Sequence, residues 1–153
     1  MRIFLITLTA LVFLQGGILD FVDINKAKEA YEKKNYDATI SHLNGLKDSL
    51  QKPSLEYNLG NAYYKKNKYE EALKHYKKAK GVDEANRLYN MGNAYANSGD
   101  IDEAIKAYEE SLKIRDDVDT KKNLELLKKK KEQQQKQQDQ KNNDQKNNDQ
   151  NKQ

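Results

Sequence analysis

The sequence predicts an all-helical fold in which about three helix hairpins are followed by a capping helix. Two observations predict this class, and a third narrows the chemistry. The stretch YNLGNAYYKKNKYEEALKHYKKA, from Tyr57 to Ala79, is followed by YNMGNAYANSGDIDEAIKAYEES, from Tyr89 to Ser111, so one unit is present twice. Within each copy the apolar residues recur at steps of three and four, which is the period of an amphipathic helix. The chain of 153 residues has no cysteine, which excludes disulfides and thiolate metal sites.

Residues 1–16 have the layout of a secretory signal peptide. Arg2 gives a short positive start, Ile3 to Leu14 is an apolar stretch, and two glycines follow. The cleavage site is a poor version of the small-x-small pattern, so a retained N-terminal anchor is the alternative. Extended to Leu19, the apolar segment is at the bottom of the length range that spans about 30 Å of hydrocarbon. We therefore expect an exported protein.

The segment 20–50 is predicted to form a first, divergent hairpin. When Tyr36 is set against Tyr69, the apolar positions of this segment fall in step with those of the next copy. Ala27 then stands in place of a glycine and Thr39 in place of an alanine. Such departures are expected of a terminal repeat, which packs against a neighbour on one side.

The segments 53–84 and 85–117 are predicted to form the second and third hairpins. Gly60 and Gly92 lie 32 residues apart, so the two copies align without a gap. Each copy has one apolar stripe before its central break and a second stripe after it. The residues expected to pack are Leu59, Gly60, Tyr63, Ala72 and Tyr76 in one copy, and Met91, Gly92, Tyr95, Ala104 and Tyr108 in the other.

Turn and capping residues mark the ends of these helices. Asn67 and Gly99 stand where a left-handed residue ends a helix. Asp100, with Glu103 three residues later, resembles a capping box that opens the next helix. Pro53 suits a first helical turn, because its missing N–H costs nothing there. Each copy is therefore expected to be two antiparallel helices.

The two glycines inside helices need a compensating contact. In a helix interior, glycine costs about 1 kcal/mol relative to alanine. The simplest explanation is a close approach of the two helices of a hairpin. We expect Gly60 to be complementary to the bulky Tyr63, and Gly92 to be complementary to Tyr95.

The C-terminal part is predicted to be a capping helix over 118–131 and a tail over 132–153. Leu124 and Leu127 are the apolar positions of the cap, which a stack of hairpins requires for solubility. The tail is rich in lysine, glutamine and asparagine and repeats the sequence KNNDQ. Its low hydrophobicity predicts disorder.

The positive charge of the chain is concentrated near this end. From residue 121 onward ten lysines face five acidic residues, whereas the whole chain carries +4. The run Lys128, Lys129, Lys130 and Lys131 predicts a weak contact with an anionic membrane or another polyanion. The simpler interpretation is that these cations complement the dipole at a helix C-terminus. No aromatic residue accompanies them, so nucleic acid is not expected as a partner.

The chain from about Asp23 to Lys131 resembles the tetratricopeptide repeat family, and the stretch from Tyr57 to Ala79 is close to the pattern of that family. The period of 32 is slightly shorter than the usual period of about 34, because the link between the copies is trimmed. The resemblance implies a short right-handed superhelix of about three repeats with a C-terminal capping helix. It also implies a scaffold that binds a protein segment on its concave face.

A narrower resemblance concerns the order of the segments. A signal sequence that runs into GILDF, three repeats, the phrase DTKKNLELLKKKKEQQQKQQ and a Lys/Gln/Asn tail are similar to the periplasmic tetratricopeptide component of the Bacteroides aerotolerance (Bat) system. That family accompanies membrane proteins with von Willebrand factor A domains and a MoxR-type ATPase. The resemblance implies a location in the periplasm or at the periplasmic face of the cytoplasmic membrane, with such a membrane protein as partner.

The family's pattern also implies which residues line the concave groove. Asparagine offers both a donor and an acceptor to the backbone of an extended peptide, and tyrosine offers flat contact area. The alternative is that these asparagines only bond to neighbouring helices. The implied groove residues are Tyr57, Asn58, Asn61, Tyr64, Lys65, Tyr89, Asn90, Asn93, Asn97 and Asn123.

One known mode of peptide binding in this family is not expected. Repeat domains that hold C-terminal carboxylates combine groove asparagines with lysine and arginine at fixed positions. Here the first such position is Tyr57, and only Lys65 and Lys122 lie near the asparagines. We therefore expect no carboxylate clamp.

Catalysis has little support in the sequence. His42 and His75 occupy the same position in their repeats and are expected to face solvent, with no serine, cysteine or carboxylate pair placed to make either a base. No phosphate-binding loop or metal-ligand spacing is present. We expect no enzyme activity, no cofactor and no metal.

Overall fold

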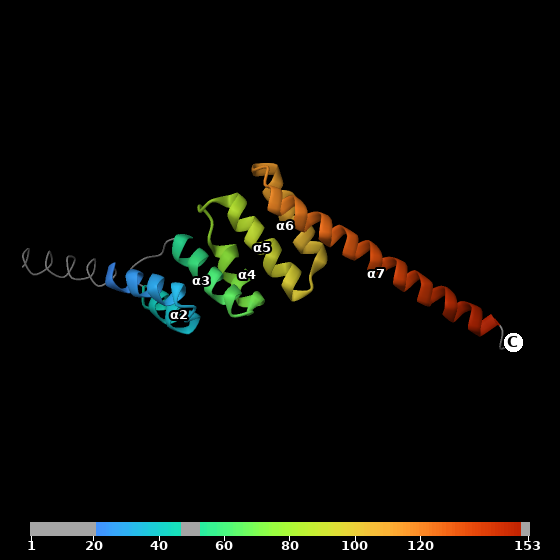
Figure 1. Cartoon of the computed structure of the whole chain (residues 1–153), viewed down its shortest axis with the longest axis horizontal. Coiled ribbons are helices and arrows are strands. Elements are labelled where there is room, and N and C mark those ends of the chain that lie inside the picture. The colour runs from blue at the N-terminus through green and yellow to red at the C-terminus, as the bar shows by residue number, and fades with distance from the viewer. Residues whose placement is uncertain (1–20, 47–52, 151–153) are drawn as a thin grey trace, which may run out of the picture. The chain divides into compact units, whose positions relative to one another are not determined.

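The structure is a computed structural model that describes residues 21–46 and 53–150, with side chains through Asn142. All regular elements in these ranges are helices, which confirms the predicted fold class (Figure 1). Within the same ranges, no helix combines the length and the apolar character that a bilayer crossing requires. The predicted signal segment 1–16 lies outside the described residues. The chain forms two compact units, 1–83 and 84–153, which are described separately.

Unit 1 contains two helix hairpins. The first consists of a helical segment over 21–32 and α2 (Tyr36–Gly45), and the second of α3 (Pro53–Lys65) and α4 (Tyr69–Lys78). Lys34 and Asn67 adopt left-handed backbone angles, with φ of 58° and 59°, at the two turns. The prediction that Asn67 ends a helix in this conformation is confirmed.

The core of unit 1 joins both hairpins. Leu59 of α3 is fully buried against aliphatic residues from the first hairpin, and Ile40 and Tyr63 pack on the same cluster. Leu43 and Leu46 lie three residues apart and Leu55 and Leu59 four apart, so each pair presents one apolar stripe to the cluster. Its members are Ala27, Leu43, Leu46, Leu55 and Leu59.

Unit 2 contains one hairpin and a long final helix. The elements are α5 (Glu84–Ser98), α6 (Ile101–Ile114) and α7 (Val118–Gln150). Gly99 has a φ of 93°, as predicted, and the Oδ1 atom of Asp100 accepts a hydrogen bond from the N–H of Glu103 at 3.3 Å. The predicted cap of α6 is therefore present. In a full capping box the N–H of Asp100 would donate to the side chain of Glu103. Here that N–H donates instead to the carbonyl of Tyr95 at 2.9 Å.

The interior glycines mark the closest approach of the two helices in a hairpin. A Cβ atom on Gly60 would lie 2.5 Å from Cε1 of Tyr76, and a Cβ atom on Gly92 would lie 2.5 Å from Cε1 of Tyr108. The predicted close approach is confirmed, but the predicted partners, Tyr63 and Tyr95, are wrong. Residues three apart on one helix lie side by side on its surface, whereas the space above the glycine is entered by the facing helix.

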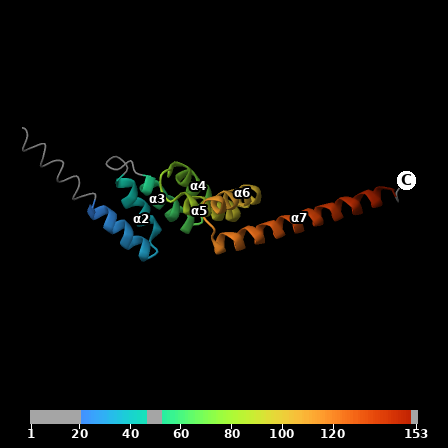
Figure 2. The same cartoon turned by 90° about the horizontal axis from the view of Figure 1, so that it is seen from above.

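The final helix is longer than the predicted cap. α7 packs its first turns on α6 and then extends beyond α5 and α6 in both views (Figures 1 and 2). It continues through residues 132–150, where the sequence predicts a disordered tail. No glycine or proline interrupts this stretch, and Glu132 pairs with Lys136 one turn later at 2.6 Å. All described side chains after Leu127 are exposed, so this part of α7 adds no core.

Candidate functional site

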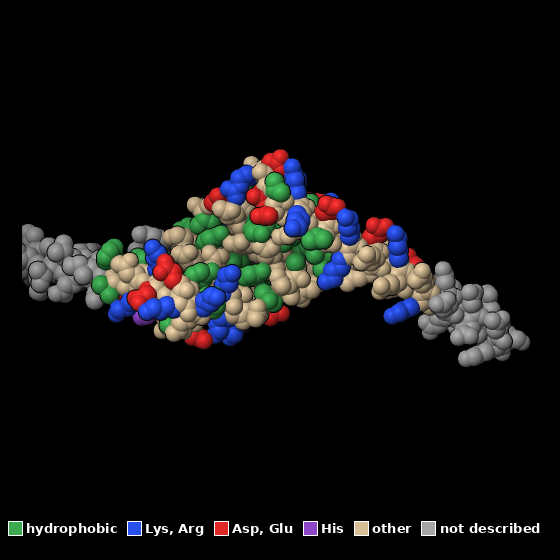
Figure 3. All heavy atoms as spheres, in the orientation of Figure 1, with side chains coloured by type: hydrophobic (Ala, Val, Ile, Leu, Met, Phe, Trp, Pro, Cys, Tyr) green, Lys and Arg blue, Asp and Glu red, His purple; other side chains and the backbone are tan. Residues whose placement is uncertain are grey.

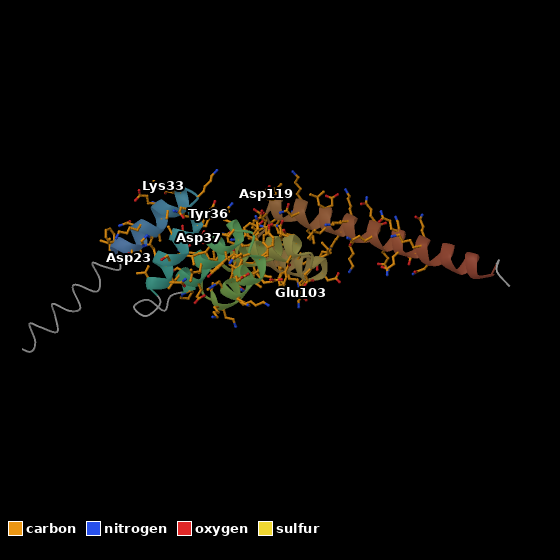
Figure 4. All side chains as sticks on the ribbon, turned by 90° about the horizontal axis from the view of Figure 1, so that it is seen from below. Asp23, Lys33, Tyr36, Asp37, Glu103 and Asp119 are labelled. Carbon is orange, nitrogen blue, oxygen red and sulfur yellow. The ribbon has the colours of Figure 1, made fainter. Side chains whose placement is uncertain are left out.

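An open cleft of about 610 Å³ lies between the two hairpins of unit 1. Its walls come from the helical segment 21–32, α2 and α3. Figure 4 labels Asp23 near the start of that segment and Lys33 just after its end, with Tyr36 at the start of α2. Four buried apolar residues form the floor: Ala27, Leu43, Leu46 and Leu55.

The rim of the cleft is polar. Lys28 and Glu32 lie one turn apart on the segment 21–32 and are exposed. Ser54, Asn58 and Asn61 line the opposite wall from successive turns of α3. The cleft therefore combines an apolar floor with hydrogen-bonding groups along its edge, which is the usual composition of a binding site.

Tyr31 contributes an aromatic wall to the cleft. Its ring meets the ring of Tyr36 edge-on, with centroids 5.4 Å apart. Burial, followed by the neighbouring phenols of Tyr36 and Tyr57, raises the pKa of Tyr31 above its ordinary value. Tyr31 is thus an uncharged phenol at neutral pH and offers ring surface to a bound group.

A second tyrosine fixes the orientation of Asn61. The hydroxyl of Tyr76 donates to Oδ1 of Asn61 at 2.9 Å, and the ring of Tyr57 lies 5.8 Å from that of Tyr76. Burial is the main cause that raises the pKa of Tyr76 far above its ordinary value, with smaller contributions from Tyr57, Tyr31 and Tyr64. The phenol therefore remains a hydrogen-bond donor, and it holds the amide of Asn61 in one orientation.

The predicted groove residues of unit 2 bond to one another. The hydroxyl of Tyr108 donates to Oδ1 of Asn93 at 2.6 Å. The Nδ2 atom of Asn123, on α7, lies 3.4 Å from the same oxygen and 3.5 Å from the hydroxyl of Tyr89. Asn97 donates from Nδ2 to the backbone carbonyl of Asn93 at 2.8 Å. The contacts of Asn93 with Tyr108 and Asn123 connect α5 to α6 and α7, whereas the bond of Asn97 stays within α5.

The remaining predicted residues fall into two groups. Tyr64 packs its ring 5.6 Å from that of Tyr69, Lys65 is exposed at the end of α3, and Asn90 is half-buried on α5. A groove through residues of both units stays a prediction.

Of the predicted packing residues, Tyr63 and Tyr95 are half-buried, and the others are buried: Leu59, Gly60, Ala72, Tyr76, Met91, Gly92, Ala104 and Tyr108.

The two histidines pair with carboxylates. The Nδ1 atom of His75 lies 2.6 Å from Oε2 of Glu56, and its side chain is only 13% exposed. Its ring stacks on that of Tyr63, with centroids 5.0 Å apart. The expectation that His75 faces solvent is therefore wrong, because α3 packs against this face of α4 and covers the imidazole. His42 lies 3.5 Å from Asp23 and is more exposed.

Comparison with known proteins finds a family similar to the central part of the chain. Residues 51–117 match the family model described as tetratricopeptide repeat. This part of the chain is therefore similar to tetratricopeptide repeats. No curated protein sequence matches the chain.

Solved tetratricopeptide structures share the fold over more of the chain. The TPR2AB domain of yeast Sti1, in its pHSP90 complex, has a TM-score of 0.68 and 21% identity, and the match covers 78% of this chain and 50% of that one. The Sgt2 TPR domain of Aspergillus fumigatus has a TM-score of 0.66 and 20% identity, over 80% and 82% of the two chains. The second TPR domain of human RPAP3, in complex with the HSP70 peptide SGPTIEEVD, has a TM-score of 0.66 and 20% identity, over 74% and 98%. The match spans half the length of the solved yeast domain, and at these identities the likeness shows the fold alone.

The cleft also includes residues that the sequence prediction missed. Ile24, Lys28, Tyr31 and Glu32 line it from the first hairpin. They lie 33 residues before Tyr57, Asn61, Tyr64 and Lys65, respectively, which are four of the predicted groove positions. The repeat alignment therefore contained the signal. The prediction missed it because the first repeat was treated as a terminal unit, and the groove was assigned to the second and third repeats.

The groups that line the cleft can form hydrogen bonds, ion pairs and apolar contacts with a bound molecule. Its described lining offers a lysine, a glutamate, amides, hydroxyls and apolar groups, and the His75–Glu56 pair lies outside it. Across the described ranges, no group of three or more histidine, cysteine, aspartate or glutamate residues is placed to hold a metal ion.

Proposed function

We propose that this chain is a non-enzymatic tetratricopeptide repeat scaffold that holds a segment of a partner protein. The observation that carries the proposal is the cleft of unit 1, with its apolar floor and its edge of Lys28, Asn58 and Asn61. The first helices of two successive repeats supply this edge, which is where the fold presents its inner face. A protein segment can bury apolar side chains there while the amides bind its backbone.

The similar structures support this proposal. The first TPR of Spaghetti (RPAP3) was solved with an HSP90 peptide and the second TPR domain of human RPAP3 with an HSP70 peptide. Both show that the fold is suited to binding short protein segments. By analogy, the partner of this chain is a protein, and the chain is a scaffold rather than an enzyme.

We further propose where this binding occurs. The signal-like residues 1–16 and the resemblance to the periplasmic component of the Bat system support an exported protein, in the periplasm or at the periplasmic face of the cytoplasmic membrane. The partner in this proposal is a membrane protein with a von Willebrand factor A domain, within a complex that also involves a MoxR-type ATPase.

The contacts of the lysine run favour the cleft over tethering through the tail. Lys128 pairs with Glu109 at 2.7 Å and Lys131 pairs with Asp102 at 2.5 Å, so both lysines fasten α7 to α6. Along the described side chains of α7, lysines and acidic residues lie side by side (Figure 3). A surface of mixed sign attracts an anionic membrane less than a uniform basic stretch does. Tethering is therefore the second candidate.

A crosslinking pull-down from the membrane fraction tests the proposal. It compares the wild-type protein with a Lys28→Ala, Asn58→Ala double variant and with a chain that ends at Glu132. A Lys74→Ala, Asn44→Ala double variant is the matched control, because these residues are exposed on α4 and α2 and do not line the cleft. We expect the cleft variant alone to lose a defined membrane protein, and mass spectrometry then shows whether it has a von Willebrand factor A domain. Capture that survives the cleft variant but fails on truncation supports tethering instead.

A further inference from the structure

The floor of the cleft restricts what a bound segment can place there. Its aliphatic residues are at most 7% exposed, and they belong to the core of unit 1. The hydroxyl of Thr39 also lines the cleft, but it donates to the backbone carbonyl of Asn35 at 3.0 Å. A polar or charged side chain on this floor would lose its hydration without gaining equivalent partners. The floor therefore favours an apolar side chain.

The rim restricts the charge of the segment. Among the described lining residues the charged ones are Lys28 and Glu32, one turn apart, so their charges cancel. The peptide in the human RPAP3 complex, SGPTIEEVD, contains two glutamates and an aspartate close together. Such a peptide needs several cations around it. One lysine beside one glutamate does not meet that need, so the rim disfavours an acidic segment.

The wall formed by α3 suits an extended backbone. Ser54, Asn58 and Asn61 follow one another at steps of four and three residues, so they form a polar row along one face of the helix. The bond from Tyr76 fixes the amide of Asn61. A row of hydroxyl and amide groups can bind successive peptide groups of an extended segment without reading its side chains.

We infer that the cleft of unit 1 binds a large apolar side chain from an extended partner segment that carries no net charge. The inference rests on the proposed function and specifies its ligand. The volume of about 610 Å³ lies within the range of about 300–1,000 Å³ that is usual for binding pockets. It accommodates one large side chain together with its flanking backbone. The occupant thus differs in charge from the acidic peptide of the RPAP3 structure.

Selection from a random peptide library on the immobilised full chain tests this inference. The selected peptides are then measured in solution against the wild-type protein and two matched variants. Ser54→Trp fills the cleft from an exposed rim position, whereas Ser41→Trp places the same side chain on an exposed position of α2 outside the cleft. The chain has no other tryptophan, so the fluorescence of each variant also reports whether it is folded.

We expect selected peptides that share a leucine, isoleucine, methionine or phenylalanine and have no net charge. Ser54→Trp is expected to weaken their binding by roughly tenfold or more, and Ser41→Trp to leave it within about twofold. Binding of an uncharged segment should change little between about 0.05 and 0.5 M salt, because little charge is neutralised. Circular dichroism of both variants controls for folding.

Other outcomes separate the inference from the proposed function. Selected peptides that are acidic, or whose affinity falls steeply with salt, overturn the inference and leave the scaffold proposal standing. The same holds if Ser54→Trp binds the peptides as tightly as Ser41→Trp does. If no peptide is selected and Ser54→Trp converts a dimer into a monomer in sedimentation, the cleft holds a second copy of the chain. That result overturns the inference and removes the support for the proposed function.

Discussion

The hairpins α3–α4 and α5–α6 are copies of one sequence pattern, and some of their contacts are identical. In both, a glycine of the first helix lies under a tyrosine ring of the second, at Gly60 with Tyr76 and at Gly92 with Tyr108. In both, the hydroxyl of that tyrosine donates to an asparagine one residue after the glycine. The contacts between the two helices of a hairpin are therefore the part of the pattern that is repeated.

Other positions of the two hairpins differ. The Glu56–His75 pair of the first corresponds to Leu88 and Ala107 in the second, which are both buried. The core residue Leu55 corresponds to Arg87, which is 8% exposed and bound to Glu84 and to Sδ of Met91. The repeated pattern therefore determines the contacts between the two helices of one hairpin. The other faces of these helices differ in sequence between the two hairpins.

Alanine at the two interior glycines should have the largest effect. Helix propensity favours Gly60→Ala and Gly92→Ala by about 1 kcal/mol, but a Cβ atom 2.5 Å from a buried ring overpacks the hairpin by about 1–3 kcal/mol. We expect both variants to be destabilised by similar amounts in urea unfolding. The control is Gly45→Ala, because nothing lies within 4 Å of a Cβ atom there. A stabilised Gly60→Ala or Gly92→Ala variant would contradict the close approach.

Alkaline pH should test the buried tyrosine of the α3–α4 hairpin. Burial raises the pKa of Tyr76 in the folded state above the ordinary value of about 10. Below pH about 10 the phenol is protonated in both the folded and the unfolded chain, so the free energy of unfolding keeps its full value. Above that pH the unfolded chain releases a proton that the folded chain keeps, so the free energy of unfolding falls. We expect the free energy of unfolding to fall by up to about 1.4 kcal/mol per pH unit above that point.

Tyr76→Phe provides the control for this pH dependence. It keeps the ring under Gly60 and removes the ionising hydroxyl, so the alkaline loss of stability should be smaller than in the wild-type protein. Chemical unfolding at several pH values, followed by circular dichroism, measures both slopes. Equal slopes for the two proteins would show that the hydroxyl of Tyr76 is not the group responsible.

The Glu56–His75 pair, which the α5–α6 hairpin lacks, should contribute about 1 kcal/mol. A double-mutant cycle with Glu56→Ala and His75→Ala at neutral pH isolates the coupling between the two side chains. The cycle with Asp23→Ala and His42→Ala is the matched control in the first hairpin. Its coupling should be smaller, because the atoms lie 3.5 Å apart and the side chains are more exposed. A larger coupling in the control cycle would contradict this ranking.

A capping substitution should have the smallest effect and make the two hairpins more alike. Asp100 caps α6 through its side chain, whereas Lys68 at the equivalent position of α4 makes no such bond. We expect Lys68→Asp to stabilise the protein by about 0.5–1 kcal/mol, since the carboxylate gains an N–H partner and favours the helix N-terminus. Thermal unfolding measures the gain, and Asp100→Ala should give a loss of similar size. An unchanged melting temperature in both variants would show that these caps do not contribute to the stability of the protein.

The helices, their turns and the repeat could be predicted from the sequence because local patterns encode them. The period of the apolar residues fixed the buried face of each helix, and Asn67, Gly99 and Asp100 marked ends through their own backbone and side-chain preferences. The fold class followed from repetition, since a duplicated hairpin buries its apolar face only against another hairpin. The length of α7 did not follow, because an exposed polar helix and a disordered segment have nearly the same composition.

The partners across helices were decided only by the tertiary structure. The sequence showed that Gly60 needs a close neighbour, but the angle at which α4 crosses α3 selects Tyr76 rather than Tyr63. The cleft depends in the same way on how the first two hairpins meet. The repeat alignment marks Ile24 and Lys28 as groove positions, but only packing sets them opposite Asn58 over a shared apolar floor. Periodicity is local and can be read along the chain, whereas complementarity exists only between surfaces that folding brings together.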